Sequence, residues 1–278
     1  MSMEGKICIV TGANSGIGKA TAMGLAKMNA TVVMVCRSKE RGEVAQKEII
    51  ELTGNNKVDL LICDLSSQKE IRDFATEFKS KYQNLHVLIN NAGVMLSKKL
   101  LSVDGFETNF AVNFLAPFLL TNLLLEMLKK SAPSRIINVG SAAHRMGKID
   151  FEDLQRKNKK GRFFRLYGSS KLALTLVSYE LSRKLEDSHV TVNVVHPGLI
   201  NTNLGRDRNS TSSGFTRKFL KSPEIGAETS IYLASSPEVE GVTGKYFVNK
   251  EVKPSSKTSY NEEYAKRMWE ISLEMTKL

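Results

Sequence analysis

The chain of 278 residues is 41% hydrophobic and 25% charged, which favours an ordinary globular protein with either one large domain or two small ones. Its formal net charge of +11 leaves three anionic partners to consider: nucleic acid, an anionic membrane surface or an anionic cofactor. Its three cysteines, Cys8, Cys36 and Cys63, lack metal-ligand spacing, so we expect reduced core thiols in a cytoplasmic protein and no metal site.

Apolar runs of strand length alternate with helical patterns along the chain. Seven runs predict strands: "KICIVTG", "TVVMVCR", "VDLLICDL", "HVLINNAG", "SRIINVGS", "VTVNVVHPG" and "GKYFVN". The intervening patterns predict helices at residues 18–28, 40–52, 69–82, 109–130, 169–186 and 227–234. Nearly continuous Val, Ile and Leu runs suit strands covered on both faces, so the alternation predicts a doubly wound parallel α/β sheet of the Rossmann type. Without a linker or a composition break, we expect a single domain over residues 1–278.

The chain enters a strand pattern almost at its first residue, and no secretory signal is recognisable there. The longest apolar stretch, residues 114–128, includes Pro117, Asn122 and Glu126 and falls short of the ~20 apolar residues that a membrane-spanning helix requires. We therefore expect a buried helix and no transmembrane segment.

A glycine cluster, Gly12, Gly16 and Gly18, joins the first predicted strand to the first predicted helix. A tight turn there lets a pyrophosphate approach the backbone N–H groups of a helix N-terminus, where partial positive charge favours anions. This position predicts a dinucleotide site, and a tight turn without a ligand is the alternative.

The residue that reads the 2′ position of such a cofactor is expected about 20 residues after the last loop glycine. Arg37 stands there, followed by Lys39 and Arg41. An arginine would pair with a 2′-phosphate, whereas an acidic residue would accept from a free hydroxyl. Arg37, with help from Lys39 or Arg41, predicts NADP(H) over NAD(H), and a surface arginine is the alternative.

Tyr167 and Lys171 lie one helical turn apart and would meet on one helix face. Nicotinamide chemistry needs a group that moves a proton on the carbonyl or alcohol oxygen while hydride moves at carbon. A tyrosine can do so only if its pKa of about 10 is lowered, for which a nearby cation is the simplest device. We expect Tyr167 to be the general acid/base and Lys171 to tune it, with a solvated pair as the alternative.

The spacing TGxxxGxG at residues 11–18, combined with the later YxxxK, resembles the classical branch of the short-chain dehydrogenase/reductase family. The resemblance implies that Ser141 hydrogen-bonds the substrate oxygen and that Asn113 holds a water linking Lys171 to solvent. The alternative interpretations are that Ser141 only caps a helix or turn and that Asn113 is a buried amide with satisfied hydrogen bonds. The resemblance also implies cofactor contacts from Gly12, Asn14, Ser15, Gly16, Ile17, Gly18, Asp64, Leu65, Asn91, Ala92, Gly93, Tyr167, Lys171, Pro197, Gly198 and Thr202. We interpret His144 and His196 as structural residues.

Ser141 and Tyr167 lie 26 positions apart, and an insertion at about residues 145–165 carries eight basic and three acidic residues. This insertion and the terminal "NEEYAKRMWEISLEM" are similar to the retinol dehydrogenase-like branch. That resemblance implies an apolar aldehyde, ketone or alcohol as substrate, such as a retinoid, a steroid-like molecule or a lipid-derived carbonyl. A substrate loop at about residues 201–224 and an apolar set near the chemistry fit the same prediction: Met95, Leu96, Phe151, Phe163, Leu199 and Ile200.

Two alternatives stay open at this stage, and a third is not expected. A non-enzymatic NADP(H)-binding regulator would use the same fold. Nucleic-acid binding is not expected, since no recognisable binding motif accompanies the charge. The basic insertion leaves peripheral membrane contact open, although a solvated loop is preferred. Related enzymes often pair through helices corresponding to residues 109–130 and 169–186, which suggests a homo-oligomer.

Overall fold

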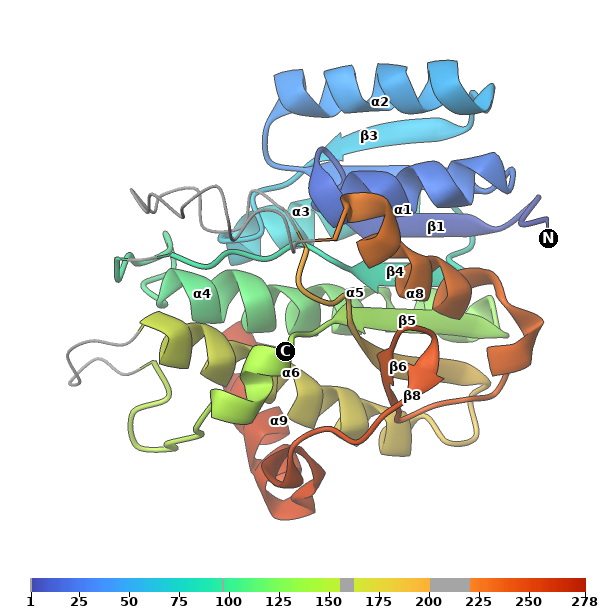
Figure 1. Cartoon of the computed structure of the whole chain (residues 1–278). Coiled ribbons are helices and arrows are strands. Elements are labelled where there is room, and N and C mark those ends of the chain that lie inside the picture. Colours follow the sequence, from blue (N-terminus) through green and yellow to red (C-terminus); the bar gives the residue numbers. More distant parts are fainter. Residues whose placement is uncertain (1, 97, 156–162, 201–220) are drawn as a thin grey trace.

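The computed structural model describes residues 2–96, 98–155, 163–200 and 221–278. In these residues one sheet has the strand order β3-β2-β1-β4-β5-β6-β7-β8, and only the pairing of β7 with β8 is antiparallel (Figure 1). The strands are β1 (Ile7–Thr11), β2 (Thr31–Cys36), β3 (Val58–Ile62), β4 (Val87–Asn90), β5 (Ser134–Val139), β6 (Val190–His196), β7 (Tyr246–Val248) and β8 (Glu251–Val252). The predicted fold class is confirmed.

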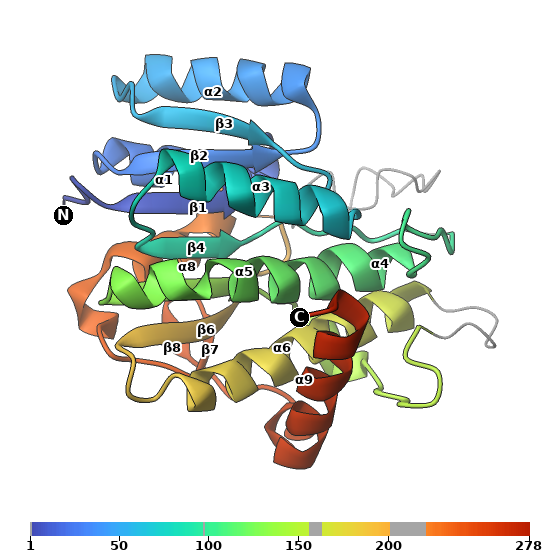
Figure 2. The same cartoon turned by 180° about the vertical axis from the view of Figure 1, so that it is seen from behind.

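Helices cover both faces of the sheet (Figures 1 and 2). One face carries α1 (Gly16–Lys27), α2 (Lys39–Thr53) and α8 (Pro223–Ser235), and the other carries α3 (Gln68–Lys81), α5 (Ala116–Lys130) and α6 (Phe163–Lys184). Shorter helical pieces are α4 (Thr108–Phe110), a π-helical turn (Ala111–Leu115) and 3₁₀ turns at Ala142–Met146, Pro237–Val239 and Lys257–Tyr260. The last helix, α9 (Glu262–Thr276), lies across α6 and reaches toward α5 (Figure 2).

The two-sided cover explains why the strands read as continuous apolar runs. Successive strand side chains point to opposite faces, so Ile9 and Val33 enter the core beneath α3, α5 and α6. Cys8 and Val32 enter the core beneath α1, α2 and α8. The residues of both layers are nearly inaccessible to solvent, and their burial supplies the main driving force for this fold.

α6 begins at Phe163, six residues before the predicted start at Ser169, and Gly168 lies inside it. A Cβ atom on Gly168 would lie 2.6 Å from the Ala143 carbonyl oxygen, in the 3₁₀ turn that follows β5. The glycine therefore allows close packing between α6 and this turn and does not mark a helix end.

Thr108–Lys130 is helical without a break, and by length and composition alone it could cross a membrane. This corrects the expectation that the segment is too short. However, 72% of its most apolar window is buried inside the protein, as expected for a core helix.

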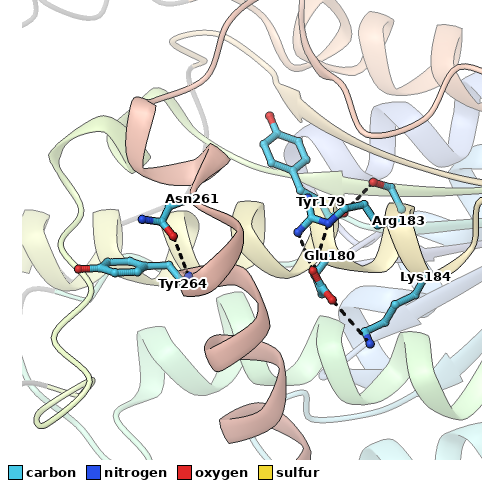
Figure 3. A network of polar contacts seen from close by, with 7 residues as sticks. Tyr179, Glu180, Arg183, Lys184, Asn261 and Tyr264 are labelled. Atoms are coloured by element: carbon cyan, nitrogen blue, oxygen red, sulfur yellow. Dashed lines mark hydrogen bonds and ion pairs between the residues drawn. The ribbon is translucent and has the colours of Figure 1, made fainter.

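α9 was not among the predicted helices, although its sequence carries a start signal. The side chain of Asn261 accepts from the Tyr264 N–H at the start of the helix (Figure 3). Trp269 packs edge-on against Phe118 of α5 with 4.9 Å between ring centroids, and the Lys184 ammonium of α6 lies 5.4 Å from the Trp269 ring. α9 thus covers part of the α5 and α6 surface for which pairing was suggested, and pairing stays a prediction.

Near that surface, the buried carboxylate of Glu180 on α6 is neutralised by its neighbours along the helix. Arg183 donates to it at 2.6 Å, and the Lys184 ammonium lies 3.6 Å away (Figure 3). Two cations at helical spacing satisfy a carboxylate that would otherwise be costly to bury.

Candidate active site

The carboxyl ends of β1 and β4 meet where the strand order reverses, which is the ligand-binding crevice of such sheets. Gly12 and Gly16 adopt φ values of 68° and 55°, a region open mainly to glycine. A Cβ on Gly18 would lie 2.3 Å from the Gly12 carbonyl oxygen and 2.4 Å from Asn91 Nδ2. Ser15 begins α1 without a side-chain cap, so its side chain satisfies none of the first N–H groups of the helix. This cradle fits a pyrophosphate.

Thr11 locks the two strand ends together, a role that the sequence did not reveal. Its hydroxyl oxygen accepts from the N–H groups of Asn91 at 3.0 Å and Ala92 at 2.9 Å. The Asn91 side chain in turn donates to the Thr11 carbonyl oxygen at 2.7 Å. These bonds hold the glycine loop against the strand end that faces it.

A pocket runs along this edge and is lined by most of the predicted cofactor residues. Those present are Gly12, Asn14, Ser15, Gly16, Ile17, Gly18, Arg37, Asp64, Leu65, Asn91, Ala92, Gly93, Tyr167, Lys171 and Pro197. Gly198 is absent from the lining, and Thr202 lies outside the described residues. Residues that sequence reasoning missed include Val35, Cys36, Ser38, Cys63, Val94, Val112, Val139 and Gly140. Most of them are direct chain neighbours of predicted site residues at the same strand ends, so adjacency to those residues would have suggested several of them.

The basic side chains after β2 divide between two places. Arg37 and Arg41 line the pocket. Lys39 instead lies 3.8 Å from Glu43 along α2 and lines a separate hollow beside β3. The structure therefore does not bring Lys39 to the cofactor pocket, because the first turn of α2 directs it toward the hollow beside β3. Arg41 lines the cofactor pocket in its place.

The four predicted catalytic residues lie near one another, and two of them, Tyr167 and Lys171, line the pocket. Lys171 is buried and donates to the Val139 carbonyl oxygen at 2.7 Å, so it is not a solvated helix residue. Its ammonium lies 6.0 Å from the centroid of the Tyr167 ring. A Cβ placed on Gly93 would lie 3.2 Å from Asn113 Oδ1 and 3.6 Å from Lys171 Nζ, which places these groups around one point.

Asn113 lies within the π-helical turn and is fully buried. Its side chain accepts from the Val94 N–H at 2.8 Å and donates to the Val94 carbonyl at 2.9 Å. It also donates to Ser170 Oγ at 3.1 Å, and Ser170 bonds to the Tyr167 carbonyl. Asn113 is thus a satisfied buried amide that ties the loop after β4 to the helix of Tyr167.

The electrostatics differ from the expectation that Lys171 lowers the pKa of Tyr167. Burial raises the pKa of Tyr167, and its hydrogen bond with the Ser141 side chain only partly opposes this. Burial also lowers the pKa of Lys171 to about 8. In this structure the pKa of Tyr167 is therefore raised rather than lowered, because burial disfavours the charged phenolate more than the Ser141 hydrogen bond stabilises it.

Ser141 lies at the end of β5, where its hydroxyl accepts from the Ala143 N–H at 3.2 Å. It therefore caps the 3₁₀ turn while also facing Tyr167.

The expected substrate region is only partly assembled around the site. Leu199 is 74% exposed, and Ile200 lies against Gly226 at the start of α8. Phe151 packs edge-on against Tyr264 of α9 with 5.1 Å between ring centroids, and it contacts Arg267. The Phe163 side chain, residues 156–162 of the insertion and residues 201–220 of the substrate loop lie outside the described part of the chain.

The fold and the cradle at its crevice define a nucleotide-binding enzyme of the Rossmann class. The family model for short chain dehydrogenases matches residues 6–213, so the chain belongs to this family and is an oxidoreductase. Retinol dehydrogenase 13 of Mus musculus is 46% identical over all of this chain and 85% of its own length. Retinol dehydrogenase 11 of Homo sapiens is 44% identical over 99% of this chain and 87% of its own length. These relatives confirm the retinol dehydrogenase branch.

Solved structures agree with this assignment. An uncharacterized protein from Mycobacterium paratuberculosis superposes with a TM-score of 0.81 at 30% identity, covering 99% of this chain and 95% of its own. The Pseudomonas aeruginosa protein RhlG, solved as a complex with NADP, superposes with a TM-score of 0.72 at 27% identity, covering 93% and 98%. Family membership assigns a nicotinamide cofactor to the pocket.

Proposed function

We propose that this protein interconverts an apolar aldehyde or ketone and its alcohol with NADP(H), using Tyr167 as the general acid/base. The observation that carries the proposal is the cluster of Ser141, Tyr167 and Lys171 beside a glycine-lined cradle for a dinucleotide. When bound, the nicotinamide would supply or accept the hydride at the substrate carbon.

The residues of the chain manage the proton and the oxygen. In reduction, the Tyr167 hydroxyl donates its proton to the carbonyl oxygen, and the Ser141 hydroxyl donates a hydrogen bond to the same atom. Lys171 supplies a fixed positive charge that offsets the negative charge left on the phenol oxygen. Asn113 positions the loop at Val94, and a water bound near Asn113 would link Lys171 to solvent in the proton relay that restores the Tyr167 hydroxyl.

Arg37 and Arg41 support the choice of NADP(H) over NAD(H). Both residues line the pocket, where their guanidinium groups would pair with a 2′-phosphate. We expect Arg37→Ala to lower kcat/KM for NADPH by about tenfold or more while leaving that for NADH little changed. Lys39→Ala is the matched control, because this neighbouring cation lies outside the pocket. An unchanged ratio of NADPH to NADH turnover in Arg37→Ala would show that Arg37 does not select NADP(H).

The relatives named as retinol dehydrogenases support a retinoid-like substrate with an apolar body. The test is an activity panel with NADPH and NADH against retinal, other apolar aldehydes and small sugars. Preference for the sugars would overturn the apolar substrate.

The mechanism is tested separately with Tyr167→Phe, which should bind NADPH normally and lose turnover. Equal turnover by this variant and the parent would favour a different acid, and no turnover by the parent would favour a non-enzymatic cofactor-binding regulator. A cytoplasmic location stays a prediction.

A further inference from the structure

The family model ends at residue 213, yet a segment beyond it reaches the strand end that carries Ser141. Arg145, in the turn after β5, donates to the carbonyl oxygens of Pro254 and Ser255. His144 from the same turn contacts Ser256. Residues 254–260, which we call the C-terminal clasp, therefore bind the turn that follows Ser141.

His144 is the centre of this contact. Its side chain is fully buried, and its ring packs against Tyr246 of β7 with 5.0 Å between ring centroids. Nδ1 lies 2.7 Å from the Ser141 carbonyl oxygen, and Nε2 accepts from the Ser256 N–H at 3.0 Å. Since a backbone N–H can only donate, Nε2 must carry the lone pair and Nδ1 the proton. The clasp thus selects the tautomer that donates to Ser141.

Ser141 receives two bonds from this one residue. Its carbonyl oxygen accepts from the His144 backbone N–H at 3.1 Å as well as from the ring. Holding the carbonyl fixes the peptide plane after Ser141 and so constrains the backbone from which the hydroxyl that meets Tyr167 projects.

The clasp is also anchored on the helix that carries Tyr167 and Lys171. The Tyr179 hydroxyl lies 2.8 Å from Ser255 Oγ, which lies 2.7 Å from Ser259 Oγ. The rings of Tyr179 and Tyr260 stack with 5.4 Å between centroids. One segment therefore touches both the turn that follows Ser141 and the helix of the general acid/base.

We propose that His144 is a positioning residue for Ser141 and that the Ser256 N–H of the C-terminal clasp holds it in the required tautomer. This role rests on the proposed function, because it presumes that Ser141 contacts the substrate oxygen.

The first test compares His144→Leu with His144→Asn in steady-state kinetics. Leucine fills the space without polar groups, whereas the asparagine amide can still donate to the Ser141 carbonyl from nearly the position of Nδ1. We expect His144→Leu to lower kcat about tenfold with KM for NADPH within about twofold, and His144→Asn to recover most of the loss. Loss of kcat in both variants alike would indicate mere packing and overturn the role.

The second test changes the clasp and leaves His144 intact. Ser256 has φ −73°, which proline can adopt, so Ser256→Pro removes the N–H donor without changing φ, and the proline ring carbon that replaces the hydrogen also pushes His144 Nε2 away from the clasp. The Ser256 hydroxyl is buried without a hydrogen-bond partner among the described residues, so Ser256→Ala is the matched control that keeps the N–H. We expect Ser256→Pro to lower kcat severalfold relative to Ser256→Ala. If His144→Leu does not fold, the comparison of Ser256→Pro with Ser256→Ala still tests whether the clasp positions His144 and Ser141.

The two proposals fail in different ways. A folded parent without turnover on any carbonyl of the panel overturns the proposed function and this role together. An active parent whose kcat survives both His144→Leu and Ser256→Pro overturns the positioning role alone.

Discussion

At the scale of single residues, Lys171 combines complete burial with a charge, and its only hydrogen-bond acceptor among the described residues is the Val139 carbonyl. The folded chain holds its pKa at about 8, below the ordinary 10.5, so the unfolded chain binds more protons between these two values. The contribution of Lys171 to stability therefore rises with pH from about 8 to 10.5, and below pH 8 the buried charge is destabilising.

Lys171→Met should accordingly be more stable than the parent near pH 7, by about 1–2 kcal/mol after the lost hydrogen bond to Val139 is counted. The advantage should shrink toward pH 10, because the parent lysine is then largely neutral when folded. Urea unfolding of both proteins at the two pH values measures it. A variant less stable than the parent at neutral pH would show that the lysine is not a destabilising charge.

At the scale of elements, the connection from β1 to α1 depends on how closely the helix approaches the loop before it. Gly18→Ala adds a methyl group that would overlap the Gly12 carbonyl, which is backbone, and the Asn91 side-chain amide, which its hydrogen bond to Thr11 holds in place. The helix must move away, which misplaces the N–H groups that face the cofactor.

We expect Gly18→Ala to raise the Kd for NADPH at least about tenfold, measured by the fluorescence of the bound nucleotide. Gly42→Ala in α2 is the matched control, because its methyl group would meet only the flexible side chain of Leu60, outside the pocket lining. Equal weakening of both variants would point to general destabilisation instead.

At the scale of the whole molecule, α9 joins segments that are far apart in the sequence. Gln68 and Arg72 of α3 donate to carbonyl oxygens at its C-terminal end, and Trp269 covers Phe118 of α5. The last helix thereby closes one side of the layer formed by α3, α5 and α6 (Figure 2).

Trp269→Ala should lower the free energy of unfolding by about 3–5 kcal/mol, since it removes a large, largely buried ring from this junction. Val103→Ala, at a position 80% exposed, is the control and should change stability by less than about 0.5 kcal/mol. Denaturant unfolding measures both. If the two changes are equally small, α9 contributes little to the stability of the fold.

Seven of the strands, most of the helices between them and the glycine loop could be predicted because they depend on local patterns, whereas the order of the strands in the sheet was not predicted. Period and turn chemistry act over a few residues, so they are visible in the sequence itself. The early start of α6 was missed because Gly168 resembles a helix boundary, while its actual reason lies at Ala143, far along the chain. α9 was missed although Asn261, two glutamates and the spacing of Ala265, Met268 and Trp269 are typical of a capped amphipathic helix.

The sequence on its own was sufficient for the fold class, the family resemblance and the set of residues at the strand ends, because parallel strands bring their carboxyl ends to one edge. It did not reveal that Arg41 rather than Lys39 lines the pocket, that burial raises the pKa of Tyr167, or that Phe151 turns toward α9. Nor did it reveal that His144 links Ser141 to the C-terminal clasp. Each of these features depends on which distant segments pack together and how much water they exclude, and local sequence carries no record of either.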